Sequence, residues 1–190
     1  NIPLSLYIHM PWCVRKCPYC DFNSHAVPDG QLSMDLERQY LEALVADFET
    51  QVEMAQGRSI HSVFIGGGTP SLISAQGYQW LFGQLKARLD FEADCEITLE
   101  ANPGTVEHDP FADYLAVGIN RLSLGVQSFD PEHLQRLGRI HSANNALDAI
   151  QQARQAGFER VNVDLMHGLP QQTEEQALTD LKLAVEQGAT

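Results

Sequence analysis

The sequence predicts an α/β fold in which parallel strands alternate with helices. Short apolar runs rich in β-branched residues predict five strands, at residues 4–9, 62–65, 96–99, 121–126 and 161–165. Helical patterns separate these runs, and such alternation implies parallel strands joined by right-handed crossovers. The residues that stand out chemically follow the ends of the predicted strands. We therefore expect one domain over residues 1–190, with a site at the carboxyl edge of its sheet.

The first three helices are predicted from periodicity and end signals. The first carries an apolar stripe with a spacing of four, formed by Leu36, Tyr40, Leu44, Phe48 and Val52, and ends near Gly57. A second helix covers roughly residues 75–89. Asp109 and Pro110 predict an N-cap and a first helical residue for a short third helix that stops at Gly118.

Three further helices follow the same logic. Asp130 and Pro131 repeat the N-cap and proline opening. We expect a helix from about Ala143 to Gly157, with its inward-facing side formed by Leu147, Ile150 and Ala153. Thr173 and Gln176 form a capping box for the last helix, in which we expect burial of Leu178, Leu181 and Val185. The series stops where a sixth strand would follow. It predicts a partial (β/α) barrel of about five units, truncated relative to a longer protein.

Composition excludes several classes of function. The formal charge of -13 argues against non-specific nucleic-acid or anionic-membrane binding as the main role. No apolar run approaches the length of a transmembrane span, and the start lacks the layout of a signal peptide. The four cysteines do not resemble a disulfide framework, because three are crowded together and Cys95 stands apart. We expect a cytoplasmic protein in which Cys95 is a small buried hydrophobic residue.

The three crowded cysteines, Cys13, Cys17 and Cys20, have the spacing C-x3-C-x2-C. A cubane iron–sulfur cluster could use all three thiolates and leave one iron without a protein ligand. That iron would coordinate an exchangeable group. Zinc with His9 as the fourth ligand is the alternative, although this spacing is not a common zinc pattern.

Unusual residues end or follow the other predicted strands: Gly66, Gly67, Gly68 and Thr69 after the second, Glu100 after the third, Gln127 after the fourth and Asp164 in the fifth. The glycine triplet could be a simple turn, and it lacks the pattern of a Walker phosphate loop. Glu100 and Arg139 could be ordinary surface charges. An unpaired Asp164 would be costly in so apolar a strand, so we expect it to bind either a ligand hydroxyl, which we favour, or a structural cation. His9, His141 and His167 are candidates by location only.

These motifs resemble a known family. C-x3-C-x2-C with Tyr19 before its last cysteine is similar to the radical S-adenosylmethionine signature. Further stretches resemble the HemN-like branch of that superfamily, in the expected order, at residues 7–13, 64–70, 125–129, 137–141 and 164–170. This branch contains oxygen-independent coproporphyrinogen III oxidases and related heme chaperones. The resemblance covers nearly the whole chain and implies a radical S-adenosylmethionine core domain.

The resemblance also implies a cofactor site. A [4Fe–4S] cluster would bind Cys13, Cys17 and Cys20, and S-adenosylmethionine would chelate the fourth iron. The other implied roles are as follows: Tyr7 near the cofactor and the cluster; Gly67, Gly68 and Thr69 at the methionine end; Glu100 near the amino group; Arg139 on the carboxylate; Gln127 and Asp164 on the ribose hydroxyls; and the backbone of Tyr19 at the adenine.

Two functions follow from the branch. The oxidases carry a further cysteine two residues after the triad, where this sequence has Phe22, and an N-terminal extension that is not seen here. Residues 17–25, 100–105 and 164–170 look closer to the heme chaperones, which implies heme as cargo. The implied partners are acceptor hemoproteins such as respiratory enzymes, an electron donor for the cluster, and a second copy in a homodimer. The alternative to a heme chaperone is a radical enzyme that decarboxylates coproporphyrinogen III. Whether the protein is an enzyme, and which residues would be catalytic, is therefore left open by the sequence. A zinc-stabilised binding module is a distant third.

Overall fold

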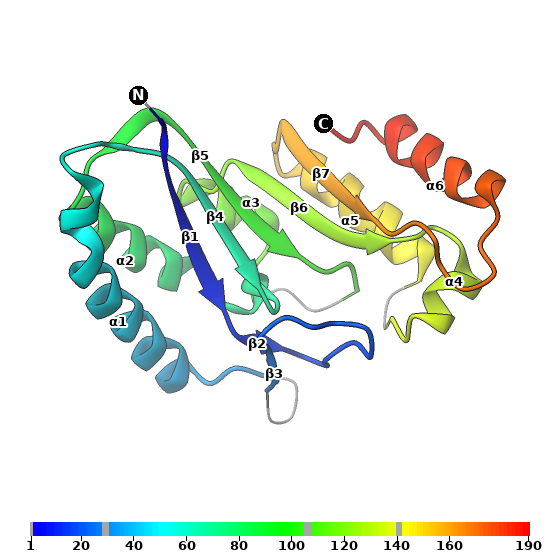
Figure 1. Cartoon of the computed structure of the whole chain (residues 1–190), viewed down its shortest axis with the longest axis horizontal. Helices are drawn as coiled ribbons and strands as arrows, with labels where there is room; N and C mark the ends of the chain where they lie inside the picture. Colours follow the sequence, from blue (N-terminus) through cyan, green and yellow to red (C-terminus); the bar gives the residue numbers. More distant parts are fainter. Residues whose placement is uncertain (1, 28–30, 105–107, 140–141) are drawn as a thin grey trace.

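Five parallel strands form the main sheet, and they lie side by side in chain order (Figure 1). They are β1 (Leu4–Met10), β4 (Ile60–Gly67), β5 (Phe91–Ala101), β6 (Arg121–Gln127) and β7 (Arg160–Leu165). The computed structural model describes residues 2–27, 31–104, 108–139 and 142–190. Within these residues β1 and β7 form the two edges of the sheet, so the sheet is open. The predicted partial barrel with parallel strands is confirmed.

Helices connect the strands and cover one face of the sheet. They are α1 (Met34–Gln51), α2 (Ala75–Lys86), α3 (Phe111–Ala116), α4 (Pro131–Arg136), α5 (Ala143–Gln155) and α6 (Glu174–Glu186), with single 3-10 turns η2 (Val52–Ala55) and η3 (Pro70–Leu72). Figure 1 shows α2, α3 and α5 passing behind the sheet, and their buried residues share one core with α1 and the strands. Because side chains alternate along a strand, the other face keeps the remaining residues of each strand.

The predicted burial of α6 is wrong. Thr173 and Gln176 form the expected capping box, but Leu178, Leu181 and Val185 are 54%, 54% and 74% exposed. The residues that α6 buries are Asp180 and Ala184. The buried side of the helix therefore combines Ala184, which joins the core, with Asp180, whose carboxylate is bonded to the loop that follows β6.

The predicted cap of the third helix is also wrong. Pro110 occupies the N-cap position of α3. The Asp109 carboxylate instead accepts a hydrogen bond of 2.7 Å from the backbone N–H of Ala75, the first residue of α2. Ser74 caps the same helix end by accepting from Gly77. Asp109 thus stabilises the positive end of a helix distant in sequence.

The first helix is placed correctly, but its buried line is shifted. The most buried apolar residues of α1 are Leu41, Val45 and Phe48, whereas Leu36 at the start of the predicted stripe is 38% exposed. Other predictions hold: Asp130 caps α4 through two backbone N–H groups, and Cys95 is buried in β5. In the described residues no helix has the length and apolar character that crossing a membrane requires.

Candidate functional site

The three clustered cysteines lie on one loop, residues 13–24, which we call the cysteine loop. Its base is closed by two short parallel strands, β2 (Trp12–Cys13) and β3 (His25–Ala26), within a segment expected to be irregular. Inside the loop the Lys16 ammonium donates to the carbonyl of Phe22 at 3.0 Å and to that of Ser24 at 3.4 Å. These bonds hold the loop in a compact turn, and all three of its cysteines line one cavity at the edge of the sheet.

A second set of contacts ties the cysteine loop to β1. The His9 ring nitrogen Nε2 lies 2.7 Å from the Asn23 carbonyl and therefore donates to it. In neutral His9 the other ring nitrogen, Nδ1, then accepts from the Tyr7 hydroxyl at 2.9 Å. Both nitrogens are engaged, so His9 is not placed to complete a zinc site. Among the described residues no three His, Cys, Asp or Glu side chains surround a single metal position.

The glycine triplet has a structural task that sequence reasoning missed. The backbone N–H of Gly68 donates to the Met10 carbonyl and that of Thr69 to the Trp12 carbonyl, each at 2.6 Å. A side chain on Gly68 would collide with the Trp12 backbone, and one on Gly67, whose φ is 113°, would meet the His9 ring. The triplet therefore packs against the segment that leads into the cysteine loop and leaves room at the cavity.

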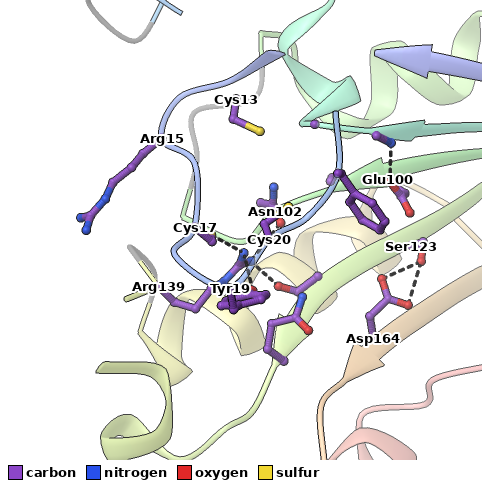
Figure 2. A pocket seen from close by; sticks show the side chains of 16 residues that line it. Cys13, Arg15, Cys17, Tyr19, Cys20, Glu100, Asn102, Ser123, Arg139 and Asp164 are labelled. Carbon is purple, nitrogen blue, oxygen red and sulfur yellow. Dashed lines mark hydrogen bonds between the residues drawn. The ribbon is translucent and has the colours of Figure 1, made fainter. Parts of the chain in front are cut away.

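One cavity gathers nearly all of the predicted site residues (Figure 2). From the predicted set it is lined by Cys13, Cys17, Tyr19, Cys20, Gly67, Gly68, Glu100, Gln127, Arg139 and Asp164. These residues come from the cysteine loop, the ends of four strands and the segment after α4, so segments far apart in sequence meet at the carboxyl edge. His167 is exposed and does not line this cavity, and His141 lies outside the described residues.

Two predicted site residues lie beside the cavity and do not line it. Thr69 is buried and its hydroxyl accepts a hydrogen bond of 3.1 Å from the Asn102 amide. Tyr7 is 56% exposed on the open face of the sheet. Burial and the negative charge of Glu100 raise the pKa of Tyr7 above its ordinary value.

Arg139 is the cation at the centre of the cavity. Its guanidinium donates to the carbonyl of Gly125, to the Asn102 amide oxygen at 2.9 Å and to the Cys17 sulfur at 3.4 Å. Figure 2 shows it between Asn102 and the cysteine loop. Among the described residues no carboxylate lies within ion-pair distance of Arg139, and its buried Nε has no partner. Its positive charge is thus available for an anionic ligand.

Two carboxylates lie on the other side of the cavity. The Glu100 carboxylate accepts from the Gly67 N–H at 3.1 Å. Burial raises the pKa of Glu100, the Gly67 N–H opposes this rise, and the negative charge of Asp164 adds to it. The Asp164 carboxylate accepts from the Ser123 hydroxyl at 3.0 Å and from the Asn162 amide at 2.7 Å. Asp164 is therefore held in a fixed orientation, and the two acids together favour a cationic group.

Several functional neighbours were not predicted from sequence. Ser123 and Asn162 orient Asp164, and Asn102 bonds Arg139. A side chain on Gly125 would collide with the Asn102 amide and crowd Gln127 and Arg139, so this glycine makes room for their convergence. The available signal was the period of two: Asn162 precedes Asp164 by two positions, and Ser123 precedes Gln127 by four.

The residues that line the cavity fit a ligand in which an α-amino acid is joined to a ribonucleoside. Arg139 matches a carboxylate, Glu100 with Asp164 matches cationic groups and hydroxyls, and the exposed backbone of Gly67 and Gly68 allows close approach. The three thiols beside them have no disulfide partner. A radical S-adenosylmethionine protein needs this combination of thiols and polar groups at the carboxyl edge of its sheet.

The comparison with protein families agrees with this class. The family model described as the radical SAM superfamily matches residues 7–184, so the chain belongs to that superfamily. Within it the chain is similar to members of the HemN-like branch. It is 54% identical to the heme chaperone HemW of Haemophilus influenzae and 55% identical to that of Escherichia coli. Each alignment covers 184 residues, 97% of this chain and 48% of the relative, so the chain spans about half the length of these relatives.

A solved structure supports the same branch. The coproporphyrinogen III oxidase HemN of Escherichia coli, described as a radical SAM enzyme, superposes with a TM-score of 0.83 at 33% identity. The match covers 98% of this chain and 42% of that protein. Methylornithine synthase, with a TM-score of 0.62 and 16% identity, shares the fold alone.

Proposed function

We propose that this chain is the cluster-bearing core of a heme chaperone, a protein that binds heme and passes it to acceptor hemoproteins. The observation that carries the proposal is the single cavity in which the cysteine loop meets Glu100, Arg139 and Asp164. The identity of 54–55% to proteins named heme chaperone HemW supports the chaperone side. Heme as cargo and the acceptor hemoproteins are part of the proposal, because the chain spans about half of each relative.

In this proposal Cys13, Cys17 and Cys20 hold a [4Fe–4S] cluster, and the cavity holds S-adenosylmethionine against it. Bound together, these groups supply one-electron reductive chemistry, with the protein providing position and electrostatics. Arg139 supplies the positive charge for the cofactor carboxylate. Ser123 and Asn162 keep the Asp164 carboxylate turned toward ribose hydroxyls.

Further side chains complete the arrangement. Glu100 accepts from the cofactor amino group while the Gly67 N–H holds its carboxylate in place. Gln127 reaches the ribose from the end of β6, Thr69 supports the methionine end through Asn102, and the backbone of Tyr19 lies at the adenine. Tyr7 borders the site through His9, whose bond to Asn23 fixes the cysteine loop.

The second candidate is an oxygen-independent coproporphyrinogen III oxidase. The superposition on HemN with a TM-score of 0.83 favours it. Phe22, which stands where the oxidases carry a further cysteine, is 62% exposed and lines the cavity. An apolar ring at that position supplies no thiolate, which is why we place the oxidase second.

Anaerobic reconstitution tests the cluster. Wild-type protein is expected to bind about four irons and four sulfides, and the EPR spectrum of its reduced cluster should change when S-adenosylmethionine is added. Cys17→Ser should lose the cluster, whereas the matched control Cys95→Ser should keep it, since Cys95 is buried in β5 away from the loop. An intact cluster whose spectrum ignores S-adenosylmethionine would overturn the cofactor assignment.

Heme and porphyrinogen assays separate the two functions. The chaperone proposal predicts stoichiometric heme binding and transfer to an apo-hemoprotein without turnover of coproporphyrinogen III. Rapid decarboxylation with release of 5′-deoxyadenosine would favour the oxidase.

We also place the protein in the cytoplasm as one domain over residues 1–190, since its described cysteines are free thiols suited to a reducing compartment. The electron donor and a homodimer stay predictions.

A further inference from the structure

One row of side chains crosses the open face of the main sheet next to the cavity. The strand register pairs Tyr7 with Phe64, Phe64 with Thr98, Thr98 with Arg121, and Arg121 with Arg160. Paired residues of neighbouring parallel strands point to the same face, so these five side chains lie next to one another. Four spacings between strands of about 4.8 Å give the row a length of about 19 Å.

The β1 and β4 end of the row is an exposed aromatic pair. The rings of Tyr7 and Phe64 stack with centroids 6.3 Å apart and planes inclined by 17°. Tyr7 is 56% exposed and Phe64 is 40% exposed. Two parallel rings left open to solvent on one face offer a flat apolar surface, which is the surface that another planar π-system stacks on.

The β6 and β7 end of the row is cationic. Arg121 and Arg160 share one carboxylate, that of Glu96, at 3.6 Å and 2.9 Å. Among the described residues it is the only acidic side chain paired with either arginine; Glu92, on the same strand, bonds His61. Two guanidinium groups against one carboxylate leave one positive charge in excess. The geometry therefore offers unused N–H donors to a ligand carboxylate.

A small residue joins the two ends. Thr98, at the middle of the row, is only 3% exposed, and the strand register places it between the aromatic pair and the arginine pair. The row lies two residues before the one that contains Glu100, Ser123 and Asn162. At about 3.3 Å per residue it is therefore within about 7 Å of the cavity along the strands.

We propose that this row binds a planar tetrapyrrole carboxylate, with the macrocycle stacked on Tyr7 and Phe64 and its carboxylates on Arg121 and Arg160. Charge complementarity selects this occupant: a neutral planar ligand would leave the arginine pair unused, and a small anion would leave the rings unused. The inference rests on the proposed function, whose relatives are named for heme, and adds where on this chain the macrocycle lies.

Titration with protoporphyrin IX and with its dimethyl ester tests the row, with binding followed by Soret absorbance. The iron-free ligand removes any contribution from a residue that ligates the metal. Phe64→Ala should weaken both ligands about fivefold, because it removes one stacking ring; Phe64→Leu serves if the alanine variant does not fold. The double variant Arg121→Gln with Arg160→Gln should weaken the diacid about tenfold and leave the diester unchanged.

A variant with the opposite sign sharpens the test. Glu96→Gln frees both guanidinium groups and should tighten the diacid severalfold without affecting the diester. Glu49→Gln is the matched control for total charge, because it also removes one negative charge and Glu49 pairs with Arg88 away from the row. Equal affinities of all variants for the diacid would overturn the row as a site.

The outcome is separable from the cluster test. Absence of porphyrin binding by wild-type protein would also overturn the row, since all of its residues lie in this chain. Neither result touches the proposed cluster and cofactor, which iron content and the EPR response judge independently. Thermal unfolding of each variant checks that the fold is intact.

Discussion

The two faces of the same sheet differ in almost every property. On the helix-covered face, Ile65, Leu99 and Leu124 are completely buried and apolar. On the open face, Glu100 follows Leu99 in sequence, Ser123 and Gly125 flank Leu124, and all three line the cavity. Each strand therefore alternates between a residue that stabilises the fold and a residue that serves the site. Stability and binding should be separable by substitutions one position apart.

The largest expected effect on stability is at the covered face. Leu99→Ala should lower the free energy of unfolding by about 2–5 kcal/mol, because it removes buried methyl groups and leaves a cavity in the core. Chemical denaturation followed by circular dichroism measures this change. In molecules that remain folded, the EPR response to S-adenosylmethionine should persist. A loss below about 1 kcal/mol would show that this face repacks freely and would weaken the comparison.

Asp180 connects the two faces, and its substitution should affect both. Its carboxylate accepts from the Ser128 hydroxyl at 2.7 Å and from the Phe129 N–H at 2.8 Å. These residues follow Gln127, whose φ of 70° is rare for a residue other than glycine. Asp180→Asn should cost about 1–3 kcal/mol, because it leaves a buried donor or acceptor without its partner.

The same variant should weaken the effect of S-adenosylmethionine on the EPR spectrum, because Gln127 loses the support that holds its backbone. Glu186→Gln, an exposed acid on the same helix, is the matched control for charge. A destabilised variant with an unchanged cofactor response would limit Asp180 to the covered face.

Glu100 should make stability depend on pH. Burial raises the pKa of its carboxyl above the unfolded value. A carboxyl with a raised folded-state pKa contributes stability below its unfolded pKa, and this contribution is lost as pH rises through the folded-state pKa. Glu100→Gln should therefore gain stability relative to wild type at neutral pH, and this gain should shrink as the pH falls through the folded-state pKa toward about 4 and stay constant below it. A difference in stability that is constant from acidic to neutral pH would contradict this account.

The smallest effect is expected on the outer side of α6. Val185 is 74% exposed, so Val185→Thr should change the free energy of unfolding by less than about 0.5 kcal/mol. Thermal unfolding of the two proteins side by side measures the difference. A loss comparable to that of Leu99→Ala would mean that this side of α6 is covered in solution.

Much of the fold was predictable because strand signals are local. The five apolar runs became the five strands of the sheet, and the residues that ended them converged at one edge. Contacts between distant segments were not predictable in the same way. Asp109 carries an N-cap signal for its own helix but bonds Ala75, 34 residues earlier. The periodicity of α6 predicted an apolar stripe without indicating what would pack against it.

In the site, too, local signals were predictable and contacts between distant segments were not. Asp164 was selected because an unpaired carboxylate in an apolar strand is costly, and Arg139 because of the family resemblance. Ser123 and Asn162 looked like ordinary strand residues, and their importance lies in bonds to Asp164 that only the strand register creates. The glycine triplet was expected to admit a ligand, yet Gly68 also admits the Trp12 backbone.

The anchoring of the cysteine loop implies an order for folding and cluster insertion. The loop is fastened by His9 on β1 and by Gly68 and Thr69 after β4, which follow it by about fifty residues. Its thiols acquire their mutual positions only when β1 and β4 have paired. We therefore expect cluster delivery to be a late step in maturation, in which a donor meets a folded receiver and not a nascent chain.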